Sequence, residues 1–202
     1  MFYRPEDGHG LPHDPFKAIV APRPIGWIST RSRDGLLNLA PYSFFNAISS
    51  HPHLVMFSSE GEKDSCTNAA ETGEFVTNVV SRDLVDAMNR SSVNAPRGTS
   101  EFEFAGLEPA ASNLVAPPRV AKALAAMECV VTDIRRPTGR NGKPAGVVLV
   151  TGEVVGIHIA DHALKNGLFD IESAGTVGRL GYMDYSSVTE TFSLSRPVWR
   201  DD

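Results

Sequence analysis

Two long apolar segments constrain the fold of this chain more than any other feature. They run from Ala123 to Arg135 and from Val147 to Ala160, and the connection between them contains Asn141-Gly142. Asn-Gly between two apolar runs is a strong signal for a β-hairpin, because both residues tolerate the left-handed backbone of a tight hairpin turn. Paired strands of this length are typical of a closing barrel, so the sequence predicts a mainly β fold.

Shorter strands and a few short helices complete the expected architecture. The strands are expected over Ile25–Arg31, Leu37–Ala40, Tyr42–Ala47, Leu54–Ser58 and Glu74–Val80, and the helices over Lys63–Thr72 and Asp83–Arg90. Pro41 interrupts two of these strands and predicts a bulge or a sheet edge, where a missing donor is tolerated. Roughly six to eight strands with two or three short helices favour a small barrel over a doubly wound sheet.

The chain of 202 residues is expected to form a single domain (1–202). Residues 1–22 contain four prolines and are expected to be an N-terminal arm, with one helical turn near Pro15, and residues 186–202 are expected to be a C-terminal tail. Between Ser91 and Pro118 we expect a long excursion packed loosely on the body. Loops of that length are unusual unless they are functional.

Composition argues against several classes of partner. The net charge of −5 lacks the basic footprint that nucleic acids and anionic membranes require. No apolar run approaches the about 18 residues that span a bilayer, and the first residues do not resemble a signal peptide, so a cytoplasmic protein is expected. Cys66 and Cys129 are too few for a disulfide framework or a four-ligand zinc site.

The six histidines do not predict a metal site or a catalytic triad. His51 and His53 would share one strand face, but no carboxylate or cysteine of suitable spacing accompanies them. His158 and His162 have helical spacing, yet His158 falls in an expected strand. Nothing in the spacing selects one serine as a nucleophile. Surface or structural histidines are the better interpretation, and no catalytic residue is assigned.

Two polar segments point to a flavin. In the first, Asn38 to Phe45, backbone groups freed around Pro41 could face the polar edge of an isoalloxazine ring, with side-chain bonds from Asn38 and Ser43. In the second, Lys63-Asp64-Ser65, a lysine and a hydroxyl at a helix start could hold a phosphate. The plainer alternatives are an edge strand with a bulge and a solvated helix start. No GxGxxG motif opens a helix after a strand, so a Rossmann unit is absent.

Six segments between Pro22 and Tyr185, read in order, resemble the flavin reductase-like family with the FMN-binding split-barrel fold. They read PRPIGWIST, NLAPYSFFNAISSHPHLVMFS, KDSCTNA, GEFVTN, GEVVGIHIAD and VGRLGYMDY. Family members often carry threonine where this chain has Ser65, which keeps the hydroxyl, and a second proline where it has His53. The resemblance implies a homodimer that binds FMN at or near the subunit interface.

The residues that the resemblance implies fall into four groups: at the wall of the flavin site, along the ring, near the phosphate, and in a C-terminal segment beside the flavin. In that order the groups are Trp27, Ser29 and Thr30; Ala40, Pro41, Tyr42 and Ser43; Lys63, Ser65 and Asn68; and Arg179 with Tyr182. The nicotinamide contact has no single family motif and stays open.

The function expected from this resemblance is an NAD(P)H-dependent flavin reductase. NADH or NADPH would pass a hydride to the flavin, often on behalf of a partner monooxygenase or another electron acceptor. Two alternatives remain open: an FMN-binding electron carrier without a productive nicotinamide site, and a non-catalytic flavin-binding protein.

Overall fold

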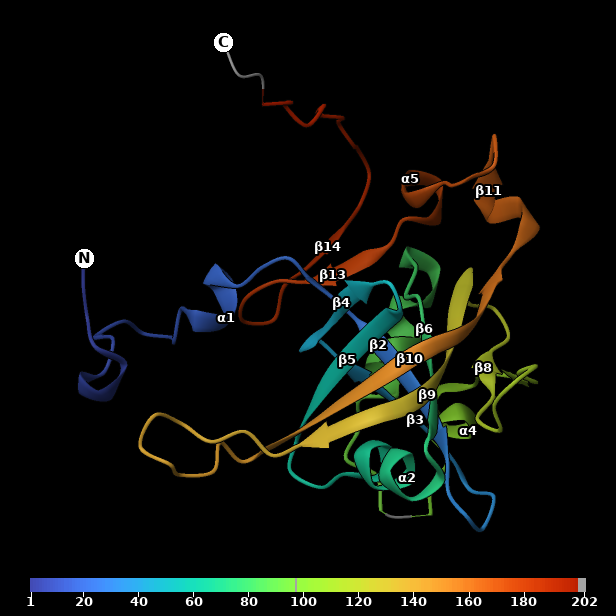
Figure 1. The fold of residues 1–202 in the computed structure, drawn as a ribbon, viewed down its shortest axis with the longest axis horizontal. Helices are drawn as coiled ribbons and strands as arrows, with labels where there is room; N and C mark the ends of the chain where they lie inside the picture. Colours follow the sequence, from blue (N-terminus) through green and yellow to red (C-terminus); the bar gives the residue numbers. More distant parts are fainter. Residues whose placement is uncertain (97, 200–202) are drawn as a thin grey trace.

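A curled antiparallel sheet forms the centre of the protein (Figure 1). The computed structural model describes residues 1–96 and 98–199. Seven strands follow the order β3-β2-β6-β9-β10-β5-β4. They are β2 (Gly26–Arg31), β3 (Leu37–Tyr42), β4 (Phe45–Ser50), β5 (His53–Glu60), β6 (Glu74–Asn78), β9 (Ala125–Arg135) and β10 (Val147–Ile159). The prediction of a mainly β protein with short helices is confirmed.

The connection between the two edge strands explains why the sheet curls. β3 and β4 lie at opposite ends of the strand order, yet β3 ends at Tyr42 and β4 begins at Phe45. The sheet must therefore bend until its two edges approach each other at residues 43 and 44, which produces a half-barrel. Pro41 lies in edge strand β3 opposite Trp27 of β2, so the expected sheet edge is confirmed.

The long hairpin of β9 and β10 is also confirmed, and its connection spans residues 136–146, as the predicted segments imply. Gly142 in that connection has a φ of 76°. The pairing shifts register between Thr151 and Gly152, as a β-bulge does. A Cβ on Gly152 would lie 2.5 Å from Cε1 of Phe75, so only glycine fits at this bend.

Two cores pack against opposite faces of the sheet. The inner core fills the half-barrel and includes Ile28, Phe57 and Phe75, with α2 (Asp64–Thr72) packed against it through Cys66 and Ala69. The outer core includes Trp27, Leu39, Leu84, Met88 and Phe102, and is covered by η2 (Arg82–Leu84), α3 (Val85–Arg90) and α4 (Glu101–Ala105). Strand β2 is therefore buried on both faces.

From Glu101 to Val115 the excursion is anchored to the body, so the expectation of loose packing is wrong for that part, whereas Ser92, Val93, Asn94 and Pro96 are exposed. Phe102 of α4 is only 1% exposed. Glu128 of β9 is fully buried and accepts backbone N–H bonds from Asn113 and Leu114 at 2.7 and 2.6 Å. The reason is that a short helix and a buried carboxylate tie the segment to the sheet at two places. It also contributes β7 (Pro109–Ala110), which pairs with β8 (Arg119–Val120).

The two ends of the chain meet on one side of the body before they extend away from it (Figure 1). β1 (Arg23–Pro24) pairs with β13 (Val177–Arg179), which pairs with β14 (Tyr185–Ser187). The arm carries η1 (Pro5–Asp7) and the expected helical turn, α1 (Phe16–Ile19). The remaining short elements are η3 (Asp161–Ala163), β11 (Leu164–Lys165), β12 (Leu168–Phe169) and α5 (Ile171–Ala174). Within the described residues, no helix combines the length and apolarity needed to cross a membrane.

Candidate functional site

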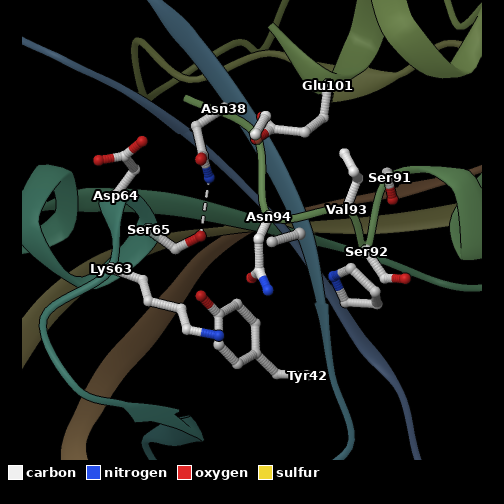
Figure 2. Close-up of a pocket in the computed structure, with 13 residues that line it drawn as sticks. Asn38, Tyr42, Lys63, Asp64, Ser65, Ser91, Ser92, Val93, Asn94 and Glu101 are labelled. Carbon is white, nitrogen blue, oxygen red and sulfur yellow. Dashed lines mark hydrogen bonds between the residues drawn. The ribbon is translucent and has the colours of Figure 1, made fainter. Parts of the chain in front are cut away.

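A pocket of about 320 Å³ opens where β3, the start of α2 and the segment after α3 come together. We call it the β3–α2 pocket. The predicted site residues that line it are Asn38, Ala40, Pro41, Tyr42, Lys63 and Ser65. The others on its wall are Asp64, Ser91, Ser92, Val93, Asn94, Ala95 and Glu101. Figure 2 shows these side chains around the opening.

Polar groups from β3 and α2 meet at one end of this pocket. The Asn38 side-chain amide donates to Oγ of Ser65 at 2.7 Å, the bond that is dashed in Figure 2. Lys63 is the residue before the first turn of α2 and has an extended backbone, with φ −85° and ψ 167°. Among the described residues, Lys63 forms no salt bridge. The combination offers a cation, a hydroxyl and free helical N–H groups to an anion.

Tyr42 gives the pocket an aromatic wall with a polar tip. Its ring is half-buried and lies 5.0 Å, centroid to centroid, from the ring of Phe57 in the inner core. Burial raises the pKa of the Tyr42 hydroxyl, so this group is a neutral hydrogen-bonding partner at ordinary pH. Such a ring suits the flat apolar face of a ligand.

Glu101 is a pocket residue that the sequence did not reveal. It is 7% exposed, and it accepts the backbone N–H of Leu39, in edge strand β3, at 3.1 Å. Burial raises the pKa of this carboxyl group. The one signal in the sequence was the length of the Ser91–Pro118 excursion, which contains Glu101, because loops of that length are unusual unless they are functional. A carboxylate on the wall can accept hydrogen bonds from ligand hydroxyls, and it disfavours a phosphate at its own end of the pocket.

Four predicted residues lie behind the pocket rather than on its wall. Trp27, Ser29 and Thr30 are fully buried, and Asn68 is 5% exposed. Trp27 donates through Nε1 to Oγ of Ser91 at 2.9 Å, so it fixes a wall residue. The Asn68 amide donates to Oγ1 of Thr30 at 3.1 Å. Ser29 donates to the carbonyl oxygen of Pro118. Their side chains therefore support the pocket and do not face into it.

The remaining predicted residues lie next to the pocket. Ser43, Arg179 and Tyr182 line a second cavity of about 370 Å³, which shares Pro41 and Ser92 with the β3–α2 pocket. The structure thus gathers most of the predicted set around Pro41, although Arg179 is far from it in sequence.

The chain belongs to the flavin reductase-like family. The sequence model of the flavin reductase like domain matches residues 20–180, most of the chain. A protein of Halalkalibacterium halodurans without an assigned function is 39% identical over 184 residues, which cover 89% of this chain and 88% of that protein.

Solved structures agree with this assignment. Nitrilotriacetate monooxygenase component B from Bacillus cereus is 32% identical, covers 96% of this chain and 98% of its own, and superposes with a TM-score of 0.86. The 2-nitrobenzoate 2-nitroreductase NbaA of Pseudomonas fluorescens is 26% identical, with coverages of 93% and 91% and a TM-score of 0.81. A protein with a split barrel domain from Shewanella frigidimarina superposes with a TM-score of 0.78 at 22% identity, over 92% and 90% of the two chains. The predicted split-barrel fold is confirmed.

Proposed function

We propose that the protein is a flavoprotein that binds FMN in the β3–α2 pocket and reduces flavin with NADH or NADPH. The observation that carries the proposal is the pairing of Lys63 and Ser65 at the start of α2 with the edge strand around Pro41. A lysine, a hydroxyl and free N–H groups fit a phosphate monoester. Backbone groups on either side of a proline in an edge strand fit the polar rim of an isoalloxazine ring.

Each proposed residue has a distinct task. Lys63 and Ser65 would hold the phosphate, with Asn38 orienting the Ser65 hydroxyl through the 2.7 Å bond. Ala40, Pro41, Tyr42 and Ser43 would flank the ring, while Trp27, Ser29, Thr30 and Asn68 would support these groups from behind. Bound FMN would supply the hydride-accepting chemistry, and the protein needs no acid or base of its own for that transfer.

The phosphate proposal is tested by comparing two ligands that differ only in the phosphate. We expect Lys63→Met to weaken FMN by about tenfold or more, because a charge-assisted hydrogen bond contributes about 1.5–3 kcal/mol. Riboflavin affinity should stay nearly unchanged. Lys143→Met, which removes an exposed lysine from the 136–146 connection, is the matched control. Equal losses of FMN and riboflavin in Lys63→Met would show that Lys63 does not meet the phosphate.

The reductase proposal needs a second assay, because a flavoprotein electron carrier would pass the first. Oxidised flavin absorbance should bleach on anaerobic addition of NADH or NADPH at catalytic rates. Bound flavin that neither nucleotide reduces would instead support the carrier. The Bacillus cereus relative is named as a component of a monooxygenase, which favours a partner monooxygenase as the electron acceptor.

We further propose a single-domain homodimer that works in the cytoplasm, with residues 1–22 and 186–202 as its arm and tail. Exposed apolar side chains on β9 and β10, such as Val130 and Ile157, and in the tail, such as Phe192 and Trp199, suggest a covered surface. Both cysteines are buried and unpaired, as expected for a reducing compartment.

A further inference from the structure

Three cations line the second cavity, which adjoins the β3–α2 pocket at Pro41 and Ser92. They are Lys17 of α1, Arg23 of β1 and Arg179 of β13. Among the described residues that line this cavity, none is acidic. We call it the arginine cavity. At about 370 Å³ it is within the range of small-molecule sites.

The two arginines are held side by side although their charges repel. Arg23 and Arg179 are direct partners in the β1–β13 pair. Arg23 is 6% exposed and donates to the backbone carbonyls of Lys17 and Val20 and, at 2.8 Å, of Leu180. Burial, and then the charge of Arg179, lower the pKa of Arg23. Positive charge concentrated in this way is costly, and a bound anion would offset the cost.

The wall that carries Arg179 packs closely on α1. A Cβ on Gly181 would lie 2.4 Å from the Cβ of Ala18, so the turn after β13 packs directly on α1. Tyr182 in that turn has a φ of 54°, a left-handed backbone that is strained for a tyrosine. Its carbonyl accepts a hydrogen bond from Arg179 at 2.6 Å. Cζ of Arg179 also lies 4.3 Å from the ring centre of Tyr185.

These contacts fix the plane of the Arg179 guanidinium but use only part of its donors. A guanidinium has five N–H donors in a rigid fork that matches phosphate oxygens. Tyr182, which is 52% exposed, offers an aromatic face beside it on which a base could stack. The cavity therefore combines an anion site with an aromatic surface, next to the pocket proposed for the flavin.

We propose that the arginine cavity binds the adenosine diphosphate group of a dinucleotide. The inference rests on the proposed function, because the neighbouring pocket would hold the flavin with which that dinucleotide reacts or of which it is part. Two molecules carry the group: the reductant NADH or NADPH, and FAD. Their shared chemistry is a diphosphate joined to a purine nucleoside.

The test is calorimetric titration of the FMN-loaded protein with ADP and, separately, with adenosine. We expect ADP to bind and adenosine to bind at least about tenfold more weakly, since charge-assisted bonds to the phosphates are the main contribution. Arg179→Ala should weaken ADP by about tenfold. Because Arg179 also holds the turn, Lys17→Ala is the second variant. Among the described residues, the exposed Lys17 side chain contacts only Glu60, at 4.0 Å, and the Phe44 ring, with Nζ 5.7 Å from the ring centre, so its removal should leave the fold intact and weaken ADP by about threefold or more. Arg140→Ala, at an exposed arginine of the 136–146 connection, is the control.

Absence of ADP binding, or equal ADP affinity in the wild type and both variants, would overturn the inference. FMN binding is measured first. If the protein binds FMN but not ADP, only the assignment of the arginine cavity is wrong. If the protein does not bind FMN, the proposed function is wrong. Steady-state kinetics and flavin titrations then identify the source. A raised KM for NADH with unchanged kcat in Lys17→Ala supports the reductant, and a reduced preference for FAD over FMN supports FAD. If neither quantity changes, the assignment to a dinucleotide is wrong.

Discussion

Replacing Glu128 by glutamine should destabilise the protein substantially, although this substitution hardly changes the shape of the side chain. Glu128 is fully buried, and its Oε2 accepts the N–H groups of Leu114 and Val115 at 2.6 and 3.1 Å. Its Oε1 accepts the N–H of Asn113 at 2.7 Å and lies 2.5 Å from Nε2 of His158. A glutamine keeps only one acceptor oxygen, so its NH₂ group would face either the N–H groups of Leu114 and Val115 or the N–H of Asn113 beside the His158 ring.

The expected loss follows from the one or two N–H donors that would face this NH₂ group. An unsatisfied buried hydrogen-bonding group costs about 1–3 kcal/mol, so one or two give about 1–6 kcal/mol of unfolding free energy. A domain with about 5–15 kcal/mol of total stability should remain folded but melt several degrees lower. Urea unfolding of the flavin-free protein at fixed concentration measures the difference. Glu62→Gln is the control, because solvent screens the exposed Glu62–Arg136 pair and its loss should hardly change the free energy of unfolding. Equal effects of the two substitutions would refute the argument.

The same carboxylate predicts the sign of a pH effect. Burial alone would raise the pKa of Glu128, but its hydrogen bonds from Asn113, His158, Leu114 and Val115 outweigh burial and lower it. A lowered folded-state pKa contributes stability above the unfolded value of about 4.3, and this stability is lost as the pH falls through the folded value. The gap between wild type and Glu128→Gln should therefore be full at neutral pH and shrink in acid. A gap that is constant with pH would show that the Glu128 charge is not responsible.

Three further predictions concern the barrel, the pocket and the assembly. Gly152→Ala should destabilise the fold by about 1–3 kcal/mol in urea unfolding, because the new Cβ would meet the Phe75 ring at 2.5 Å; an unchanged midpoint would contradict the steric argument. Glu101→Gln should bind FMN more tightly at neutral pH, because it removes a negative charge from the pocket proposed for the phosphate, and weaker binding would show that the carboxylate itself contacts the ligand. Sedimentation velocity should show a dimer at micromolar concentration, and a folded monomer that still binds FMN would exclude an obligate dimer.

Sequence reasoning succeeded where local chemistry decides the structure. Asn-Gly between apolar runs predicted the β9–β10 hairpin. The predicted helix end at Thr72 is also correct, because Gly73, the next residue, has a left-handed backbone with a φ of 77°. Pro41 predicted a sheet edge, because proline lacks the backbone N–H donor that a central strand needs for pairing on both sides. Lys63 and Ser65 could be paired with the β3 residues because α2 starts shortly after β5, the strand that the β3–β4 connection brings close to β3, where Phe57 lies against Tyr42.

The failures arise where a distant segment decides which surface is covered. The sequence of β2 indicates only that successive side chains point to opposite faces of the sheet. In the structure both faces are buried, because α3 and α4 cover the outer one. The resemblance implied that Trp27, Ser29 and Thr30 line the flavin site, whereas their side chains are fully buried behind the pocket. Glu101 was missed because α4 has five residues, too few for a helical period to be recognised.

The excursion from Ser91 to Pro118 connects these failures with the proposed function. Its first residues line the β3–α2 pocket, Phe102 joins the outer core, and its end is held by Glu128. A ligand in the pocket therefore stabilises the same segment that the Glu128 contacts hold in place. FMN at about 100 times its Kd adds about 2.7 kcal/mol to the unfolding free energy, which is comparable to the loss expected in Glu128→Gln. Saturating FMN should consequently restore much of the melting temperature of that variant, whereas riboflavin, if it binds more weakly, should restore less at the same concentration.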